Sequence, residues 1–386
     1  MINLTRLVGG RETVSTTIRK SAEVGRWVES APVTVWNITN VCNLRCRHCY
    51  ASSLPSEPED ELTTEEALGL IDDMASMGVP LLIFSGGEPL MREDIFELCR
   101  YATRAGIKTI FSTNGVFIDD DAAEELKRSG ARYVGVSVDG LKERHEEMRG
   151  MPGCFEKSLE ALEILREKGL RTGIRFTVTK QNVQDLEAMF DILEEMKIPR
   201  ICVYHLVYSG RGVGMRSEDL NLSERRRLLD FLIERALELR DERDAEVETV
   251  NSPADGVYTY LKLRELDGDS ADRALQVLRR YGGDPTGSKV ANVDQLGRVH
   301  PNQFWWDHTL GVVKRARFSD IWLRSRDSLL IKLRSKSRFV KGRCGRCVHR
   351  EICAGYRLRA LRVYGDVWAE DPGCYLSEEE TLEAKW

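Results

Sequence analysis

Three cysteines in the run VCNLRCRHCY are close enough in sequence to bind one metal cluster. They are Cys42, Cys46 and Cys49, with the spacing C-x3-C-x2-C. Three thiolates in one loop can hold three irons of a four-iron cluster and leave the fourth iron open to a substrate or cofactor. A structural zinc site normally takes four protein ligands and pairs its cysteines at C-x2-C spacing. The spacing therefore predicts a catalytic 4Fe-4S cluster with an open iron, and zinc is the alternative.

A second set of cysteines lies near the other end of the chain, with the spacing C-x2-C-x5-C-x20-C. Four thiolates can close a metal site completely, around zinc or around a second iron-sulfur cluster. The members of this set are Cys344, Cys347, Cys353 and Cys374. Of the other three cysteines, Cys99 and Cys202 are predicted to be small core residues, and Cys154 a free thiol in a loop.

A Gly-Gly-Glu turn follows an apolar run at Ser85 to Pro89. Its glycines, Gly86 and Gly87, let backbone groups approach a ligand closely. Its carboxylate, Glu88, could hold an ammonium group. An ordinary turn is the alternative interpretation.

Two further polar turns follow apolar runs, at 112–115 and 137–140. Ser, Asn, Asp and Gly favour turns for structural reasons alone, so each turn is a weak signal by itself. The candidate ligands in and shortly after these turns are Ser112, Asn114, Ser137, Asp139 and Arg149.

Three cationic or titratable side chains lie on later apolar runs or just after them. Arg175 interrupts an apolar run, and a buried arginine needs a partner, either a ligand carboxylate or an internal acid. His205 ends another apolar run and is either a core histidine or a catalytic residue that contacts substrate. Arg211 lies in the loop that follows and is predicted to be a flexible cation that binds a substrate carboxylate.

Six β-rich runs alternate with amphipathic helical runs between residues 33 and 210. Strands alternating with helices of this length predict parallel β/α units, and six units make an open, partial (β/α)6 barrel with function at the C-terminal strand ends. The strands are predicted over 33–39, 80–84, 108–112, 133–138, 173–179 and 200–207. The helices are predicted over 63–77, 94–105, 119–129, 155–168 and 183–196.

Changes in composition divide the 386-residue chain into four parts. An N-terminal extension, 1–32, precedes the barrel, 33–220. A charged segment, 221–284, is predicted to be helical and to bridge to a C-terminal domain, 285–386. That domain is rich in Gly, Trp, Cys and Arg.

The bulk composition predicts a cytoplasmic protein with neither a membrane nor a nucleic acid as partner. The sequence lacks an apolar run of the ~18 to 20 residues that span a bilayer, and residues 1–19 lack the apolar core of a signal peptide. Sixteen Lys or Arg but only three acids lie between Lys314 and Arg362. This basic stretch could face an anionic substrate, although a solvated surface explains it equally well.

The cysteine triad with Tyr50 directly after it, the Gly-Gly-Glu turn and the six β/α units resemble the radical S-adenosylmethionine (radical SAM) enzymes. The resemblance implies that the open iron binds SAM, and that electrons from a flavodoxin- or ferredoxin-type donor cleave SAM to methionine and a 5′-deoxyadenosyl radical. It implies that the residues that hold SAM are Tyr50, Gly86, Gly87, Glu88, Ser112, Asn114, Ser137, Asp139, Arg149 and Arg175.

The C-terminal cysteines, with Gly355 after Cys353, resemble the SPASM domain that carries auxiliary clusters in this family. In the associated Gly-x-Val-x-Pro hairpin, residues 297–301, Asn302 stands where a further cysteine is usual. The resemblance therefore implies one auxiliary 4Fe-4S cluster at the four C-terminal cysteines. Either all four ligate it, or one of them yields its place to substrate.

Several stretches, among them 204–212, 254–258 and 364–374, resemble the tetrapyrrole-tailoring branch of the family. This implies a siroheme-derived iron tetrapyrrole, 12,18-didecarboxysiroheme, as substrate. The reaction that the resemblance implies is the removal of propionates, as in heme d1 biosynthesis, or of acetates, as in siroheme-dependent heme b biosynthesis. The Phe-Trp-Trp-x-His pattern of 304–308 favours the heme d1 type. These aromatics could form the core of the small domain, or they could stack on the ring, with His205, His300 or His308 as an iron ligand.

Two other functions are open on the sequence alone. A SPASM enzyme that modifies a ribosomal peptide would share both cysteine sets, although about thirty residues before the first strand leave little room for a leader-binding domain. A non-catalytic iron-sulfur electron carrier would need no Gly-Gly-Glu turn and no barrel.

Overall fold

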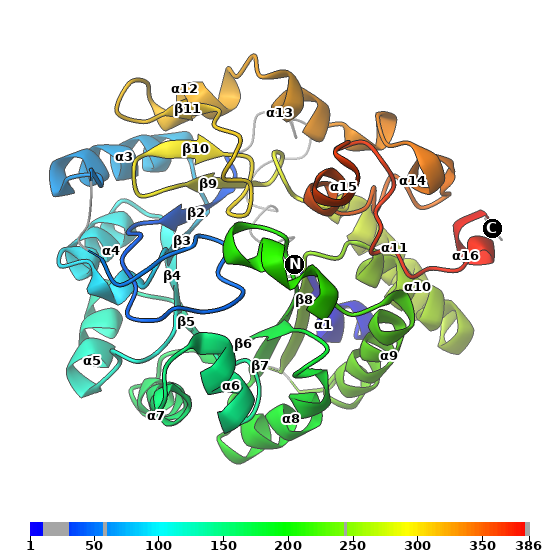
Figure 1. Cartoon of the computed structure of the whole chain (residues 1–386), viewed down its shortest axis with the longest axis horizontal. Helices are drawn as coiled ribbons and strands as arrows, with labels where there is room; N and C mark the ends of the chain where they lie inside the picture. The colour runs from blue at the N-terminus through cyan, green and yellow to red at the C-terminus, as the bar shows by residue number, and fades with distance from the viewer. Residues whose placement is uncertain (11–30, 57–59, 243–244, 383–386) are drawn as a thin grey trace.

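One mixed sheet organises the computed structural model, which describes residues 1–10, 31–56, 60–242 and 245–382 (Figure 1). Most of the predicted N-terminal extension, residues 11–30, lies outside these ranges. In the described part of the chain the sheet has 11 strands in the order β1-β8-β7-β6-β5-β4-β3-β2-β9-β10-β11.

The six predicted strands are present and pair in parallel, in chain order. They are β2 (Val33–Asn37), β3 (Leu81–Ser85), β4 (Lys108–Thr113), β5 (Tyr133–Ser137), β6 (Thr172–Val178) and β7 (Arg200–His205). The fold class predicted from the sequence, a partial barrel of parallel β/α units, is confirmed.

The predicted helices form an outer ring around the curved sheet (Figure 1). Local sequence sets their ends: Thr63 and Glu66 form a capping box at the start of α3, and Gly78 ends it in the left-handed conformation. The ring contains α3 (Thr64–Met77), α4 (Ile95–Arg104), α5 (Asp120–Ser129), α7 (Cys154–Glu167) and α8 (Leu186–Glu195), with an unpredicted short helix, α6 (Lys142–Arg149).

Two strands outside the predicted six extend the parallel sheet. β8 (Glu246–Val250) pairs with β7, and β9 (Val290–Val293) pairs with β2. β8 lies in the segment predicted to be wholly helical. Its glutamates, Glu246 and Glu248, are buried against Arg200, and these inward charges obscure the apolar pattern of a buried strand.

Antiparallel strands finish both edges of the sheet. β1 (Ile2–Asn3) pairs with β8 and leads into α1 (Leu4–Val8), so these N-terminal residues belong to the barrel. On the other edge, β10 (Arg298–His300) pairs with β9 and with β11 (Gly311–Val312). This is the hairpin that the Gly-x-Val-x-Pro pattern predicted.

The remaining helices cover one side of the barrel and build the C-terminal part. In Figure 1 the orange and red helices α14 to α16 gather beside α10 and α11. The bounds are α9 (Leu222–Glu238), α10 (Ala254–Leu266), α11 (Gly268–Tyr281), α12 (Phe318–Leu323), α13 (Ser328–Leu333), α14 (Gly342–Arg346), α15 (Arg357–Tyr364) and α16 (Glu378–Leu382). The 3-10 turns are η1 (Pro89–Met91), η2 (Val183–Asp185), η3 (Gly210–Glu218) and η4 (Lys336–Arg338). Within the described ranges no helix has both the length and the apolarity to cross a membrane.

Strand alternation decides which candidate residues face the inside of the barrel. Phe84, Phe111 and Val134 are buried in the hydrophobic core under the helices. Alternate residues on the same strands therefore point inward. By this register the inner face carries Ser112, Ser137 and, next to Ser137 on β6, Arg175.

Candidate active site

The N-terminal cysteines lie in the loop that follows β2, at the C-terminal end of the parallel strands. Cys42 and Cys46 are buried and Cys49 is half-buried. The Leu44 amide donates a hydrogen bond to the Cys42 sulfur at 3.4 Å. Burial raises the pKa of the Cys42 thiol to about 12, so a thiolate there requires a cation such as a cluster iron.

The Gly-Gly-Glu turn packs directly on this cysteine loop. The Gly87 amide donates to the Thr39 carbonyl at 2.7 Å, and the Glu88 amide to the Val41 carbonyl at 2.8 Å. A Cβ on Gly87 would stand 2.1 Å from the Val41 oxygen, and one on Gly86 2.5 Å from the Thr39 oxygen. The sequence predicted glycines that admit a ligand. In the structure they admit the backbone of the cysteine loop, and thereby fix that loop.

The Glu88 carboxylate is fully buried and joins the ends of β3 and β4. It accepts hydrogen bonds from the Leu90 amide, the Thr113 hydroxyl and the Asn114 amide at 2.7 to 3.1 Å. Burial raises its pKa to about 7, although these donors oppose the shift. The Asn114 side chain donates to the Asn43 side chain at 2.8 Å, so the C-terminal end of β4 also holds the cysteine loop.

Asp139 and Arg149 meet at the same loop. Arg149 Nη1 lies 3.7 Å from the Cys46 sulfur, and Arg149 Nη2 lies 2.5 Å from Asp139 Oδ2. Both side chains are buried. Although burial opposes it, the Arg149 guanidinium keeps the pKa of Asp139 below its usual value. The structure thus places both predicted cofactor-binding residues beside a predicted cluster ligand.

Arg175 lies on the inner face of the barrel and has no acidic partner among the described residues. Its guanidinium lies 4.6 Å from the centre of the Tyr204 ring. No hydrogen bond or ion pair joins this guanidinium to any other residue that the structure describes. The internal acid that the sequence left open as a partner is therefore not present among those residues, and a bound carboxylate would balance its charge.

Arg211 holds the cysteine loop and is not a free loop cation. Its Nε donates to the Cys46 carbonyl at 2.7 Å, and its Nη1 to the Ser53 carbonyl at 2.9 Å. Its amide donates to the Cys49 carbonyl at 3.0 Å. The sequence predicted a flexible cation that binds a substrate carboxylate. The structure corrects this, because two of its three nitrogens bind the protein backbone.

Replacing Arg211 with methionine is expected to reduce the iron held at the N-terminal site while sparing the C-terminal site. Each lost charge-assisted bond costs roughly 1.5 to 3 kcal/mol, so the loop becomes far less ordered. Iron content and EPR signal after anaerobic reconstitution measure the loss. Arg216→Met, which removes a cation from the same turn, η3, should retain full iron. Full iron in the Arg211 variant would contradict the role of Arg211 in holding the cysteine loop.

The four C-terminal cysteines line one cavity beside α10, together with His349, Arg343 and Arg350. Backbone amides donate to three of their sulfurs: His349 to Cys347 and Gly355 to Cys353 at 3.4 Å, and Asp371 to Cys344 at 3.3 Å. Such amide bonds to sulfur are characteristic of cluster thiolates and tune their potential. The fold therefore brings Cys344 and Cys374, which are far apart in sequence, to one site.

The four-cysteine cavity leaves zinc and an iron-sulfur cluster both open as occupants. Among the residues described, no three His, Cys, Asp or Glu side chains converge closely enough to share one metal ion. A four-iron cluster spreads its thiolates, because each sulfur binds a different iron.

Known proteins match this chain over most of its length. A family model described as the radical SAM superfamily matches residues 36–193. Fe-coproporphyrin III synthase of Methanosarcina barkeri is 46% identical, in an alignment covering 91% of this chain and 90% of that protein. The chain belongs to the radical SAM superfamily. Pre-heme d1 synthase of Dinoroseobacter shibae is 39% identical, covering 91% of this chain and 87% of that protein.

This radical SAM chain lies in the tetrapyrrole-tailoring branch, which contains those two synthases. Its fold is that of the crystal structure of Streptococcus suis SuiB bound to S-adenosylmethionine. The TM-score is 0.71 at 19% identity, covering 90% of this chain and 78% of that chain. The predicted radical SAM partial barrel is confirmed.

As a radical SAM protein the chain uses a 4Fe-4S cluster and SAM. The residues present fit both groups. The triad supplies three thiolates from one buried loop, and none of the ten cysteines is consumed in a disulfide. The inner-face residues Ser112, Ser137 and Arg175 are polar groups at the adjacent strand ends, suited to the polar parts of SAM or substrate.

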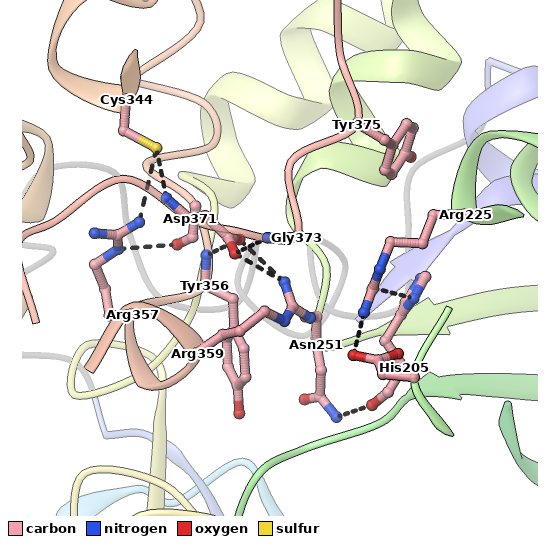
Figure 2. A network of polar contacts seen from close by, with 12 residues as sticks. His205, Arg225, Asn251, Cys344, Tyr356, Arg357, Arg359, Asp371, Gly373 and Tyr375 are labelled. Carbon is pink, nitrogen blue, oxygen red and sulfur yellow. Dashed lines mark hydrogen bonds and ion pairs between the residues drawn. The ribbon is translucent and has the colours of Figure 1, made fainter. Parts of the chain in front are cut away.

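The histidines are less available to a ligand than the sequence suggested. His205 is buried, with Nε2 2.9 Å from Asp255 Oδ2. Its Nδ1 lies 2.9 Å from Arg225 Nη1 (Figure 2). His300 is buried, with its two ring nitrogens on Asp294 and the His308 carbonyl. The catalytic assignment of His205 therefore gives way to the core interpretation. His308 keeps a half-buried ring whose Nδ1 has no protein partner in the described structure.

The aromatic run of 304–306 reaches the cysteine loop. The Tyr50 ring lies 5.0 Å from the Phe304 ring and 6.4 Å from the Trp306 ring, centre to centre. Tyr50 itself accepts a hydrogen bond from Asn37 at 2.9 Å. Trp305 is 1% exposed and belongs to the core. Trp306, which is only half-buried, is the member of the run that could contact a ring.

Sequence reasoning missed the buried polar network behind the C-terminal cysteines. Arg359 binds Asp371 through Nη1, at 3.0 and 3.1 Å, and its Nη2 donates to the Asn251 carbonyl (Figure 2). Asn251 in turn donates to the His205 carbonyl at 3.3 Å. The one available signal was the density of Lys and Arg in 314–362, for which the sequence left an anionic substrate and a solvated surface equally open. Cys154 was also misplaced, since it starts α7 and is buried against Cys46.

Proposed function

We propose that the chain removes carboxyalkyl side chains from a siroheme-derived iron tetrapyrrole in a SAM-dependent radical reaction. The observation that carries this is the 46% identity, over nine-tenths of both chains, to an enzyme named for an iron-coproporphyrin product. The unpaired Arg175 inside the barrel supports it, because the proposed substrate is a polyanion.

We favour acetates as the side chains removed. Coproporphyrin keeps propionates, so an enzyme that makes iron-coproporphyrin III must spare them. The sequence motifs favoured the heme d1 type, which removes propionates. The identity to pre-heme d1 synthase is lower, 39% against 46%, and this makes the heme d1 type the second candidate.

The bound cluster and SAM would supply the 5′-deoxyadenosyl radical, which takes hydrogen from a side-chain carbon of the ring. The protein fixes where this happens. Arg211, Gly87 and Glu88 hold the cysteine loop against the strand ends, and Tyr50 and Trp306 border it. Arg175 would anchor a carboxylate in the barrel. Rigid placement of this kind is the main contribution that a protein makes to cofactor chemistry.

The four C-terminal cysteines would hold an auxiliary 4Fe-4S cluster, able to accept the electron that the reaction releases. Anaerobically reconstituted protein is then expected to contain about eight irons per chain, two clusters of four. Metal analysis of iron and zinc checks this. About four irons with one zinc would contradict the auxiliary cluster while leaving the radical SAM site intact.

Product mass tests the proposed reaction. Reduced protein and SAM are incubated with 12,18-didecarboxysiroheme, with an electron donor of the flavodoxin type. An acetate and a propionate differ by one CH2, so the mass lost separates the two candidates. Loss of acetates is the expected result. An unchanged tetrapyrrole, with SAM still cleaved, would overturn the proposed substrate and return attention to peptide modification.

A further inference from the structure

An arginine contacts one thiolate of each cysteine set. Arg149 Nη1 lies 3.7 Å from the Cys46 sulfur, and Arg357 Nη2 lies 3.8 Å from the Cys344 sulfur (Figure 2 shows the second). The two arginines resemble each other in burial, at 8% and 0% exposed. They differ in the charge that surrounds them.

The charge of Arg149 is balanced by the protein. Its guanidinium forms an ion pair with Asp139, a fully buried carboxylate. The pair as a whole is close to neutral. It therefore exerts little net electrostatic field on a cluster bound at Cys46.

The charge of Arg357 is balanced less completely, because its direct partners are neutral carbonyls and a cysteine sulfur. Its nitrogens donate to the carbonyls of Gly355, Val367 and Ala369 at 2.6 to 3.3 Å, and to the Cys344 sulfur. No carboxylate forms an ion pair with it among the residues described. The nearby Asp371 instead pairs with Arg359.

A buried cation without an anion is costly, so some other negative charge must offset it. The group that Arg357 touches is a cysteine sulfur in the four-cysteine cavity. An iron-sulfur cluster with four thiolates is an anion, and reduction makes it more negative. A fixed positive charge at its edge stabilises the reduced form more than the oxidised form.

We propose that Arg357 raises the reduction potential of the auxiliary cluster above that of the N-terminal cluster. This rests on the auxiliary cluster of the proposed function. Of the two arginines that contact a cysteine sulfur, Arg149 is neutralised by Asp139 and Arg357 is not, and this difference favours electron uptake at the auxiliary cluster. Arg211, which also lacks an acid among the described residues, bonds the Cys46 carbonyl and not its sulfur. The N-terminal cluster is the stronger reductant and the auxiliary cluster the better acceptor.

The test is a potentiometric titration of the full-length, anaerobically reconstituted protein, followed by EPR. The Cys42, Cys46, Cys49 triple alanine variant retains only the auxiliary signal and assigns it. Arg357→Gln should lower the reduced-to-oxidised ratio of the auxiliary cluster at fixed potential at least tenfold, which is 59 mV for one electron. Arg357→Lys, which keeps the charge, should stay close to the unmodified protein.

The matched control is Arg362→Gln, on the same helix, α15. Arg362 pairs with Asp307 at the surface, so its loss should leave both potentials unchanged. An unchanged auxiliary potential in Arg357→Gln with full iron overturns this inference alone. If Arg357→Gln loses the cluster, the two cluster potentials of the unmodified protein provide the test. An auxiliary potential at or below that of the N-terminal cluster then overturns the inference. Zinc in place of the second cluster overturns the auxiliary cluster itself.

Discussion

Alanine at Cys42, Cys46 and Cys49 together is expected to abolish the formation of 5′-deoxyadenosine and to leave the auxiliary cluster in place. The three cysteines are the predicted ligands of the open cluster, and all three are free of disulfides in the described structure. Without them nothing binds SAM to an iron. The C-terminal cavity is built by a separate set of residues and keeps its own ligands. Chromatography of the nucleoside product and iron analysis measure both effects, with iron falling from about eight to about four per chain.

Cys154→Ala is the matched control for the triple variant. Cys154 is fully buried and packs with Cys42 and Cys46, yet it lies outside the C-x3-C-x2-C set. Its removal changes the packing of the loop without removing a predicted ligand, so SAM cleavage should persist. Cleavage by the triple variant, or its complete loss in Cys154→Ala, would show that the ligand set has been misassigned.

Asp371→Ala is expected to destabilise the C-terminal part by about 3 to 5 kcal/mol, the usual cost of leaving one member of a buried ion pair without its partner. Its carboxylate accepts from Arg359, from the Tyr356 amide at 2.7 Å and from the Gly373 amide at 2.9 Å. The Asp371–Arg359 pair is 2% to 3% exposed, so solvent screens it little. Thermal unfolding under anaerobic conditions should shift downward by roughly 6 °C or more.

Asp366→Ala provides the comparison. Asp366 pairs with Lys341 at the surface, and exposed pairs contribute ~0 to 1 kcal/mol. Its unfolding midpoint should therefore move little. Equal shifts in the two variants would mean that the buried network does not hold this part of the molecule together. Iron content is measured in parallel, so that cluster loss is separated from unfolding.

The sequence was most informative where the ligands of a site are neighbours in the chain. The cysteine triad spans eight residues, and its spacing alone predicted the loop that follows β2. The alternation of apolar runs gave six strands, because each is buried on both faces. The sequence did not predict β8, because Glu246 and Glu248 break its apolar pattern. Both point inward and are neutralised by Arg200, a partner nearly fifty residues away.

The residues that position the site could not be predicted, because their partners are distant in sequence. Arg211 binds the Cys46 carbonyl across 165 residues, and its sequence context indicated only an exposed loop. His205 looked catalytic because it ends a strand at the functional edge. Its ring is nevertheless occupied by Asp255 and Arg225, which lie in the segment read as a helical bridge. A single sequence carries no record of such pairings.

The pairing of β9 with β2 has a consequence for the order in which the protein is made. Val35 and Asn292 are cross-strand partners, and the Asn292 side chain donates to the Val35 carbonyl across 257 residues. During synthesis the strand that leads into the cysteine loop keeps one open edge until three-quarters of the chain has left the ribosome. Pairings of such long range form slowly and leave strand edges exposed to aggregation. We therefore expect recombinant yield to depend on slow, cool expression, and the nascent N-terminal half to need chaperone protection before iron is delivered.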